Sequence, residues 1–565
     1  MKDKKVHGPL SFAGDQLRRA KQSTPTRWGR LVHGNMVKAY CIVFASLLAQ
    51  GLWAQDTLTL NTPAPKRELR AAWIATVANI DWPSKKGLAT QQQQAEFVTI
   101  LDSLQALGMN AVIVQVRPMG DVFYPSSFEP WSEYLSGTQG VAPEPYYNPL
   151  VFMIEQARRR GMEFHAWFNP YRASMTASFT PAANHPVRQH PEWFVTYGGK
   201  LYYDPGHPGA QEYVLQAIME TVRHYDFDAV HFDDYFYPYR IAHEEFPDSC
   251  SYADYGRKRF AVKENWRRDN VNGFVAELSR RIKQEKPYMK FGISPFGVWR
   301  NIAQDSLGSR TQTGMNNYDD LYADVRKWLS EGWIDYVAPQ LYWHMAFEKA
   351  GYKTLVDWWT DNAFGKHVYI GHGIYRVGEK GWEDPAEIDN QIRYNRSSGD
   401  VAGSMYFSTK VFMQNKQGVN ARIKKLYQYP ALVPTMSWLP EQPVYAPQIW
   451  SLSGSPARGM KIEWADSQAG ASAYYVIYRY NGTSAGTLDD PQYIVSVIPR
   501  QPGIAQSWTD HAIDKRRAYT YVVTAVDRLH NESCPGKAVP IQTKGKRKKV
   551  KWEYQVTIFE RRWKH

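Results

Sequence analysis

Residues 91–117 read QQQQAEFVTILDSLQALGMNAVIVQVR, a helical pattern that runs directly into a strand pattern. Phe97, Ile100 and Leu104 recur at a spacing of three or four residues, which places them on one face of a helix. Gly108 offers that helix a natural end, because glycine readily adopts the left-handed conformation of a C-cap. The run at 110–117 is apolar until its final residues. The stretch therefore predicts one helix–strand unit of an α/β fold.

The same alternation recurs along the chain. Strand-like runs lie at residues 70–77, 110–117, 163–169, 229–236, 290–297, 335–343, 367–373 and 403–408. Eight such runs, several of them separated by clear helical patterns, predict a (β/α)8 TIM barrel over residues 66–430. An open doubly wound sheet is the main alternative, but no glycine-rich phosphate loop follows the first run. The predicted class is therefore α/β with a TIM barrel.

A second, all-β domain is predicted after the barrel. A proline-rich linker at 431–447 leads into short segments of alternating polar and apolar residues, which are typical of a small β-sandwich at 448–541. Trp464 and the alternating run from Tyr519 to Ala525 make this segment resemble a fibronectin type III domain. Residues 544–565 form a basic tail that fits neither predicted domain.

The net charge of the 565-residue chain, +13, is concentrated at its two ends. Residues 1–38 and 544–565 each carry nine Lys or Arg and two acidic residues, so the segment between them is close to neutral. A basic face on the predicted barrel is not indicated, and we expect no nucleic-acid partner.

An export signal is indicated near the N-terminus. From Met36 the chain has a lysine, a short apolar run and a small residue at Ala54, which is the pattern of a secretory signal peptide. This pattern lies far from Met1, so either translation starts at Met36 or residues 1–35 form a long basic n-region, and the first explanation is preferred. We expect residues 1–54 to be absent from the mature chain and no integral membrane segment to remain. The predicted location is periplasmic, cell-envelope or extracellular.

Strand periodicity predicts which polar side chains face the barrel interior. In AVHFDDYF, residues 229–236, His231 and Asp233 share a face opposite the apolar side chains. Asp233 is therefore the stronger candidate for a catalytic carboxylate. Asp234 is the adjacent second candidate, although its parity directs it to the opposite face unless the chain turns there.

Polar and aromatic residues at the strand ends predict a bowl suited to a sugar, which offers hydroxyls and apolar ring faces. The predicted substrate-binding residues are Arg117, Asn169, Tyr171, His231, Tyr235, Trp299, Gln340, Tyr342 and Trp343. Three acidic residues on loops at the mouth of the predicted barrel are further candidates for the second catalytic carboxylate, here called the reserve carboxylates: Asp121, Asp204 and Glu245.

Other interpretations of these residues stay open. Arg117 and Asp233 could form a buried ion pair that only organises the barrel. Packing beneath loops is as good an explanation for Tyr171, Trp299 and Trp343. A metal site built from His165, His231 and Asp233 is less favoured, because no HxH or HExxH spacing supports it.

Four motifs at successive strand ends carry a family resemblance: RAAWIATVANIDWPS, NAVIVQVRPMGDVFYPS, HAWFNPYR and HFDDYFYP. Over residues 66–410 the chain resembles the glycosyl-hydrolase-like family 10 of secreted bacterial (β/α)8-barrel proteins. The resemblance implies hydrolysis of a glycosidic bond, and some relatives are associated with cell-wall glycan stripped of its peptides. The pair His231-x-Asp233 is also similar to the Arg-x-Asp of the alpha-amylase superfamily, where that Asp is the nucleophile.

The resulting hypothesis is a secreted glycoside hydrolase that uses Asp233 and Asp234, acts on a polysaccharide or peptidoglycan glycan, and needs no cofactor or metal. Glycosidases need two carboxyl groups, about 5–5.5 Å apart for retention and about 6.5–9.5 Å apart for inversion; the sequence does not choose between them. A non-catalytic glycan-binding barrel is the alternative, because GISPFG at the fifth strand end lacks a carboxylate. A metal-dependent polysaccharide deacetylase is a weaker one.

Overall fold

The computed structural model describes residues 63–440, 443–455, 458–468, 470–514, 516–541 and 552–555. The predicted signal peptide and most of the predicted basic tail lie outside this part of the chain. Within the described residues, no helix combines the length and the apolar character that crossing a membrane requires.

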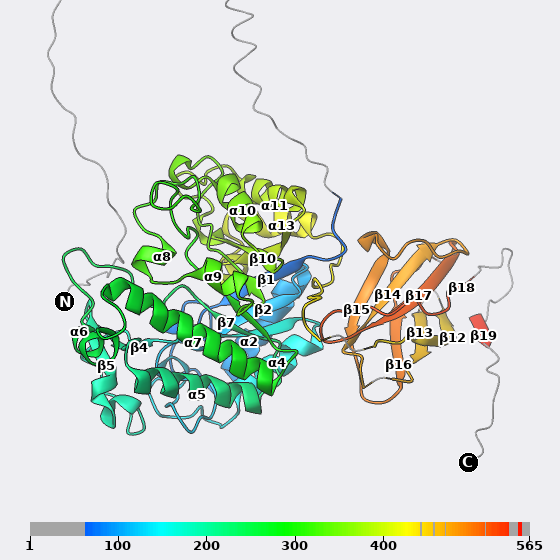
Figure 1. Ribbon diagram of the computed structural model, residues 1–565. Helices are drawn as coiled ribbons and strands as arrows, with labels where there is room; N and C mark the ends of the chain where they lie inside the picture. The colour runs from blue at the N-terminus through cyan, green and yellow to red at the C-terminus, as the bar shows by residue number, and fades with distance from the viewer. Residues whose placement is uncertain are drawn as a thin grey trace, which may run out of the picture. The chain divides into compact units, whose positions relative to one another are not determined.

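Eight parallel strands close into a barrel, as predicted (Figure 1). In barrel order they are β1 (Leu69–Ile74), β2 (Ala111–Arg117), β3 (Glu163–Phe168), β7 (Ala229–Phe232), β8 (Lys290–Ile293), β9 (Tyr336–Val337), β10 (His367–His372) and β11 (Val401–Tyr406). Most residues of these strands are buried, because helices cover the outer face and side chains fill the interior. The (β/α)8 prediction is confirmed.

Helices follow the strands and pack around them. The longer ones are α2 (Thr90–Ala106), α4 (Pro149–Arg159), α5 (Pro208–His224), α7 (Lys263–Glu285), α10 (Tyr352–Asp361), α11 (Glu387–Ser398) and α13 (Val419–Leu426). Shorter helical segments are α3 (Glu133–Ser136), α6 (Ser249–Ser251), α8 (Asn317–Asp320), α9 (Val325–Ser330) and α12 (Thr409–Gln414). In α2 the predicted face, with Phe97, Ile100 and Leu104, is buried. Gly108 has φ +81°, as its predicted capping position requires.

A small antiparallel sheet interrupts the alternation after β3. Its strands are β4 (Arg172–Ser174), β5 (Phe194–Tyr197) and β6 (Lys200–Tyr203), in the order β4–β6–β5. The turn between β5 and β6 lies at Gly198 and Gly199, with φ values of +55° and +71° that glycine adopts without strain. This sheet matters for function because it brings Arg172 and Lys200 to one pocket.

The C-terminal segment is all-β, as predicted. One sheet has the order β16–β13–β12–β19 and the other β15–β14–β17–β18. Their bounds are β12 (Gln448–Ser455), β13 (Gly459–Ala465), β14 (Tyr474–Asn481), β15 (Ile494–Pro499), β16 (Ala505–Asp510), β17 (Tyr519–Val526), β18 (Val539–Ile541) and β19 (Trp552–Gln555). Trp464, Tyr475 and Tyr521 belong to one buried cluster of this domain. The fibronectin type III assignment stays a prediction. Strand β19 was not predicted: it consists of residues of the predicted basic tail, which form the edge strand of the first sheet.

Candidate active site

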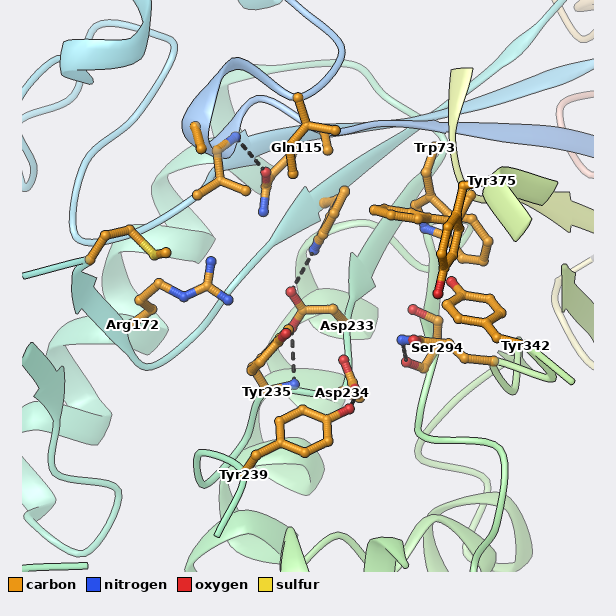
Figure 2. A pocket seen from close by; sticks show the side chains of 18 of the residues that line it. Trp73, Gln115, Arg172, Asp233, Asp234, Tyr235, Tyr239, Ser294, Tyr342 and Tyr375 are labelled. Atoms are coloured by element: carbon orange, nitrogen blue, oxygen red, sulfur yellow. Dashed lines mark hydrogen bonds between the residues drawn. The ribbon is translucent and has the colours of Figure 1, made fainter. Parts of the chain in front are cut away.

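A cavity of about 340 Å³ lies at the carboxyl ends of the barrel strands (Figure 2). This is the end at which TIM-barrel enzymes carry their chemistry. Its polar and aromatic lining includes Trp73, Gln115, Trp167, Arg172, Lys200, Tyr202, Asp233, Asp234, Tyr235, Tyr239, Ser294, Gln340, Tyr342, Tyr375 and Phe407. Carboxylates, hydroxyls and flat aromatic faces therefore converge on a space of the size that one or two sugar rings require.

Asp233 comes directly after β7 and is held by N–H donors. The indole Nε1 of Trp167 and the amide Nδ2 of Asn169 each donate to Oδ2 at 3.1 Å. The backbone N–H of Tyr235 donates to Oδ1 at 3.2 Å. Burial raises the pKa of Asp233, while the positive charge of Arg172 and these donors oppose the rise. Because all three partners donate, they favour the ionised form of Asp233.

Asp234 also lines the cavity, and its environment differs from that of Asp233. The Tyr239 hydroxyl donates a hydrogen bond to its carboxyl group. Burial, and then the negative charge of Asp233, raise the pKa of Asp234 to about 6. Strand β7 ends at Phe232, so the alternation of side chains does not extend to Asp234. The parity argument that directed Asp234 away from the site is therefore wrong.

The two neighbouring carboxyl groups are suited to different tasks. A carboxyl group with a pKa near 6 can hold a proton at mildly acidic pH and donate it. A carboxylate fixed by three N–H donors can act as a base or a nucleophile. Two neighbouring carboxyl groups whose surroundings favour different protonation states can divide the acid and base roles of an active site between them.

A hydrogen-bonded chain lies beneath the cavity, along the barrel interior. The Trp73 indole N–H donates to Nε2 of His231 at 3.2 Å. An indole can only donate, so the His231 proton lies on Nδ1, which is 2.9 Å from the Tyr336 hydroxyl. That hydroxyl can then donate to Nδ1 of His165 at 2.9 Å, and His165 Nε2 to Glu163 at 3.0 Å. Burial holds the pKa of His231 well below its usual range, consistent with a neutral ring.

His231 was predicted to bind substrate, and the structure contradicts that role. The side chain is fully buried and is not part of the cavity lining. It instead holds two groups that do line the cavity, Trp73 and the Ser294 hydroxyl, the latter at 3.0 Å. The alternative metal site also finds no support in geometry, because the described residues contain no group of three or more His, Cys, Asp or Glu placed to hold a metal ion.

Arg117 and Asn169 were likewise predicted to contact substrate, but neither is part of the cavity lining, and both hold residues next to it in place. Arg117 is fully buried and pairs with Glu129, with Nε 2.7 Å from Oε2. It also donates to the backbone carbonyls of Asn169 and Pro170 at 2.5 and 3.0 Å. The ion pair anticipated with Asp233 is therefore made with Glu129 instead. Asn169 directs its amide to Asp233 rather than to the cavity.

The predicted aromatic residues divide between the cavity and the packing around it. Tyr235 and Tyr342 line the cavity, and so does Gln340; their predicted role in substrate binding stays a prediction. Tyr171, Trp299 and Trp343 are not part of the lining and pack against other aromatic side chains. Tyr171 packs on Phe274, Trp299 stacks on Trp358, and Trp343 contacts Phe296 and Phe347.

The three reserve carboxylates are not part of the cavity lining. Asp121 is fully buried, accepts from Gln139 at 3.2 Å, and has a pKa that burial raises to about 7. Asp204 accepts hydrogen bonds from Ser251 and from the backbone of Gly206. Glu245 is largely exposed and pairs with Arg267 at 2.6 Å. None of them is placed to act with Asp233.

Several lining residues were missed by the sequence reasoning. Trp73 and Tyr239 lie within or beside motifs that had already been singled out, RAAWIATV and HFDDYFYP. Arg172 closes the motif HAWFNPYR, and Lys200 directly follows the glycine pair Gly198 and Gly199. Their positions in conspicuous motifs were a usable signal. Strand parity applied only to Trp73, which lies within β1, because Arg172, Lys200 and Tyr239 lie outside the barrel strands.

Comparison with known proteins gives consistent results. Residues 68–389 match the family described as Glycosyl hydrolase-like 10. The chain is 48% identical over 478 residues to Glycosyl hydrolase YngK of Bacillus subtilis (strain 168), covering 83% of this chain and 92% of that protein. It is 38% identical over 377 residues to Glycosyl hydrolase DigH of Escherichia coli (strain K12), covering 61% and 84%. The glycoside hydrolase domain of PgaB (BpsB) from Bordetella bronchiseptica aligns over 64% of this chain and 99% of that one, with 14% identity and a TM-score of 0.43.

Proposed function

Because this chain belongs to the glycosyl hydrolase-like 10 family and is a glycoside hydrolase, we propose that Asp233 and Asp234 hydrolyse a glycosidic bond in a bacterial cell-wall glycan or a related polysaccharide. The observation that carries the proposal is the pair itself: two adjacent carboxyl groups, in different environments, in one cavity of sugar size. The signal-peptide pattern from Met36 supports an exported enzyme that meets such glycans in the envelope or outside the cell.

Asp234 is the general acid in this proposal. It donates its proton to the glycosidic oxygen as the bond from that oxygen to the anomeric carbon breaks. Asp233 faces the positive charge that develops on the sugar, either by bonding to the anomeric carbon or by taking a proton from the attacking water. Water supplies the hydroxyl group of the new reducing end and restores the proton balance. Trp73 and Tyr342 offer apolar faces to the rings.

The test is product release by the full chain from a glycan panel. The panel contains peptide-stripped peptidoglycan strands together with neutral and acidic polysaccharides, and new reducing ends are measured. We expect cleavage of at least one glycan, and a loss of about 10³-fold or more in Asp233→Asn and of about 10²-fold or more in Asp234→Asn.

A matched control is Asp121→Asn, since Asp121 is equally buried but lies outside the cavity. This variant should retain near-normal activity. Full activity in both folded cavity variants would eliminate the assignment of these two residues. Circular dichroism of each variant separates a chemical defect from a folding defect.

A further inference from the structure

Two basic side chains enter the cavity from the small antiparallel sheet. Arg172 on β4 is 7% exposed, and its guanidinium carbon lies 4.7 Å from the centre of the Tyr235 ring. Lys200 on β6 is partly buried. Both line the same cavity as Asp233 and Asp234.

Neither cation makes a close ion pair among the described residues, although the charge of Arg172 acts on Asp233 across the cavity. Among the residues that the structure describes, no ion pair joins Arg172 or Lys200 to a carboxylate within 4.0 Å, although other buried arginines have one, such as Arg117 with Glu129. Burial and the charge of Arg172 lower the pKa of Lys200, as expected when two cations share a poorly solvated space. Two neighbouring cations without a close carboxylate favour an anionic group, so this part of the cavity is suited to an anionic substituent of a substrate.

The part of the wall that carries Arg172 and Tyr235 lies opposite a part formed by three other aromatic side chains. In Figure 2, Arg172 lies on one side of Asp233 and Asp234, and Trp73, Tyr342 and Tyr375 lie on the other. A glycan whose reacting bond lies over the two aspartates would therefore present its two flanking sugars to walls of different chemistry. One wall is suited to stacking, and the other to an anionic substituent.

We propose that Arg172 and Lys200 bind a carboxylate carried by one of the two sugars that flank the hydrolysed bond, while the other sugar stacks on the aromatic wall. The planar guanidinium group matches a carboxylate in a two-point hydrogen-bonded contact, and the lysine adds a point charge. The proposal rests on the function proposed above and adds a specificity element to it. Two kinds of sugar supply this group: a uronic acid, and an amino sugar with a carboxylated ether substituent.

The test compares each acidic glycan with its own neutral derivative. The substrates are peptide-free peptidoglycan strands, which carry lactyl carboxylates, and hyaluronan, which carries uronates, each with and without reduction of its carboxyl groups to alcohols. We expect kcat/KM of the full chain to be at least about tenfold higher on one acidic glycan than on its reduced form. The arm that shows the preference identifies the source of the carboxylate.

Variants then test whether Arg172 and Lys200 cause the preference for the acidic glycan. Lys200→Met and Arg172→Gln should each reduce the ratio of kcat/KM on the acidic glycan to kcat/KM on its reduced form severalfold. The exposed Lys424→Met should leave this ratio unchanged. Lys200→Met is the cleaner variant, because Arg172 also lowers the pKa of Asp233. Equal rates on acidic and reduced glycans, or equal losses on both in the variants, would overturn the proposal.

Failure of the proposed hydrolysis is distinguishable from failure of this inference. If none of these glycans is cleaved, calorimetry of the full chain with the same four preparations decides the inference separately. Tighter binding of one acidic form, weakened by Lys200→Met, supports the carboxylate site. Indifference to carboxyl reduction refutes it.

Discussion

The polar groups beneath the cavity form one continuous hydrogen-bonded chain, whereas the cavity lining gathers ionisable side chains of both signs that make no ion pair with one another among the described residues. Below, His231 and His165 are joined through the Tyr336 hydroxyl, and each ring nitrogen has a partner. In the cavity, Asp234 is buried beside a second carboxyl group and Arg172 is buried without a carboxylate partner among the described residues. The contrast teaches that facing inward from a strand is not enough to place a side chain in the site. Inward-facing strand residues such as His231 and Arg117 organise the barrel, whereas Asp233, Asp234 and Arg172, which follow the ends of barrel strands, line the cavity.

The largest effect on stability should come from Arg117, on the satisfied side of this comparison. Arg117→Met leaves Glu129 buried without its partner, and we expect a loss of about 3–5 kcal/mol in the free energy of unfolding. Arg172→Met removes a cation that makes no close ion pair with a carboxylate among the described residues, and it should change this quantity by less than about 1 kcal/mol. Urea unfolding of the two variants measures both. Equal losses would remove the distinction between a structural and a functional arginine.

A smaller effect, opposite in sign, is expected from Asp234→Asn. The pKa of Asp234 is about 6 in the folded protein, above its value of about 3.9 in an unfolded chain. Burial of the carboxylate therefore costs nothing below pH 4, a growing amount between pH 4 and 6, and its full value above pH 6. The variant should be more stable than the wild type by about 2–3 kcal/mol at pH 7 and indistinguishable from it at pH 3. Unfolding at both pH values tests this, and a destabilised variant at pH 7 would contradict it.

The smallest effect concerns Tyr239, whose hydroxyl favours the ionised form of Asp234. Loss of that donor in Tyr239→Phe should raise the pKa of Asp234. If Asp234 is the acid, the activity of the wild type falls as pH rises through about 6, and the variant moves this limb upward by about half a unit to one unit. The pH profile of kcat/KM measures the shift. Tyr375→Phe, which also alters a lining tyrosine, should leave the limb in place.

The barrel could be predicted from the sequence because each of its strands is a short buried run with its own turn and helix signals. The part of the site next to β7 was also predictable, since Asp233, Asp234 and Tyr235 follow one strand in one motif. Contacts between distant segments were not. Glu129 reaches Arg117 from a loop, and Lys200 reaches the cavity through a sheet inserted after β3. Periodicity carries no information about such long-range pairing.

The most direct test of the central claim distinguishes the roles of Asp233 and Asp234 by changing the leaving group of the substrate. The glycan identified by the panel is compared with its dinitrophenyl glycoside, whose leaving group departs without protonation. The account predicts that Asp234→Asn is strongly impaired on the natural glycan but regains most of the wild-type kcat/KM on the dinitrophenyl substrate, whereas Asp233→Asn stays impaired on both. Equal impairment of Asp234→Asn on the two substrates, or recovery of Asp233→Asn, would contradict the assigned roles.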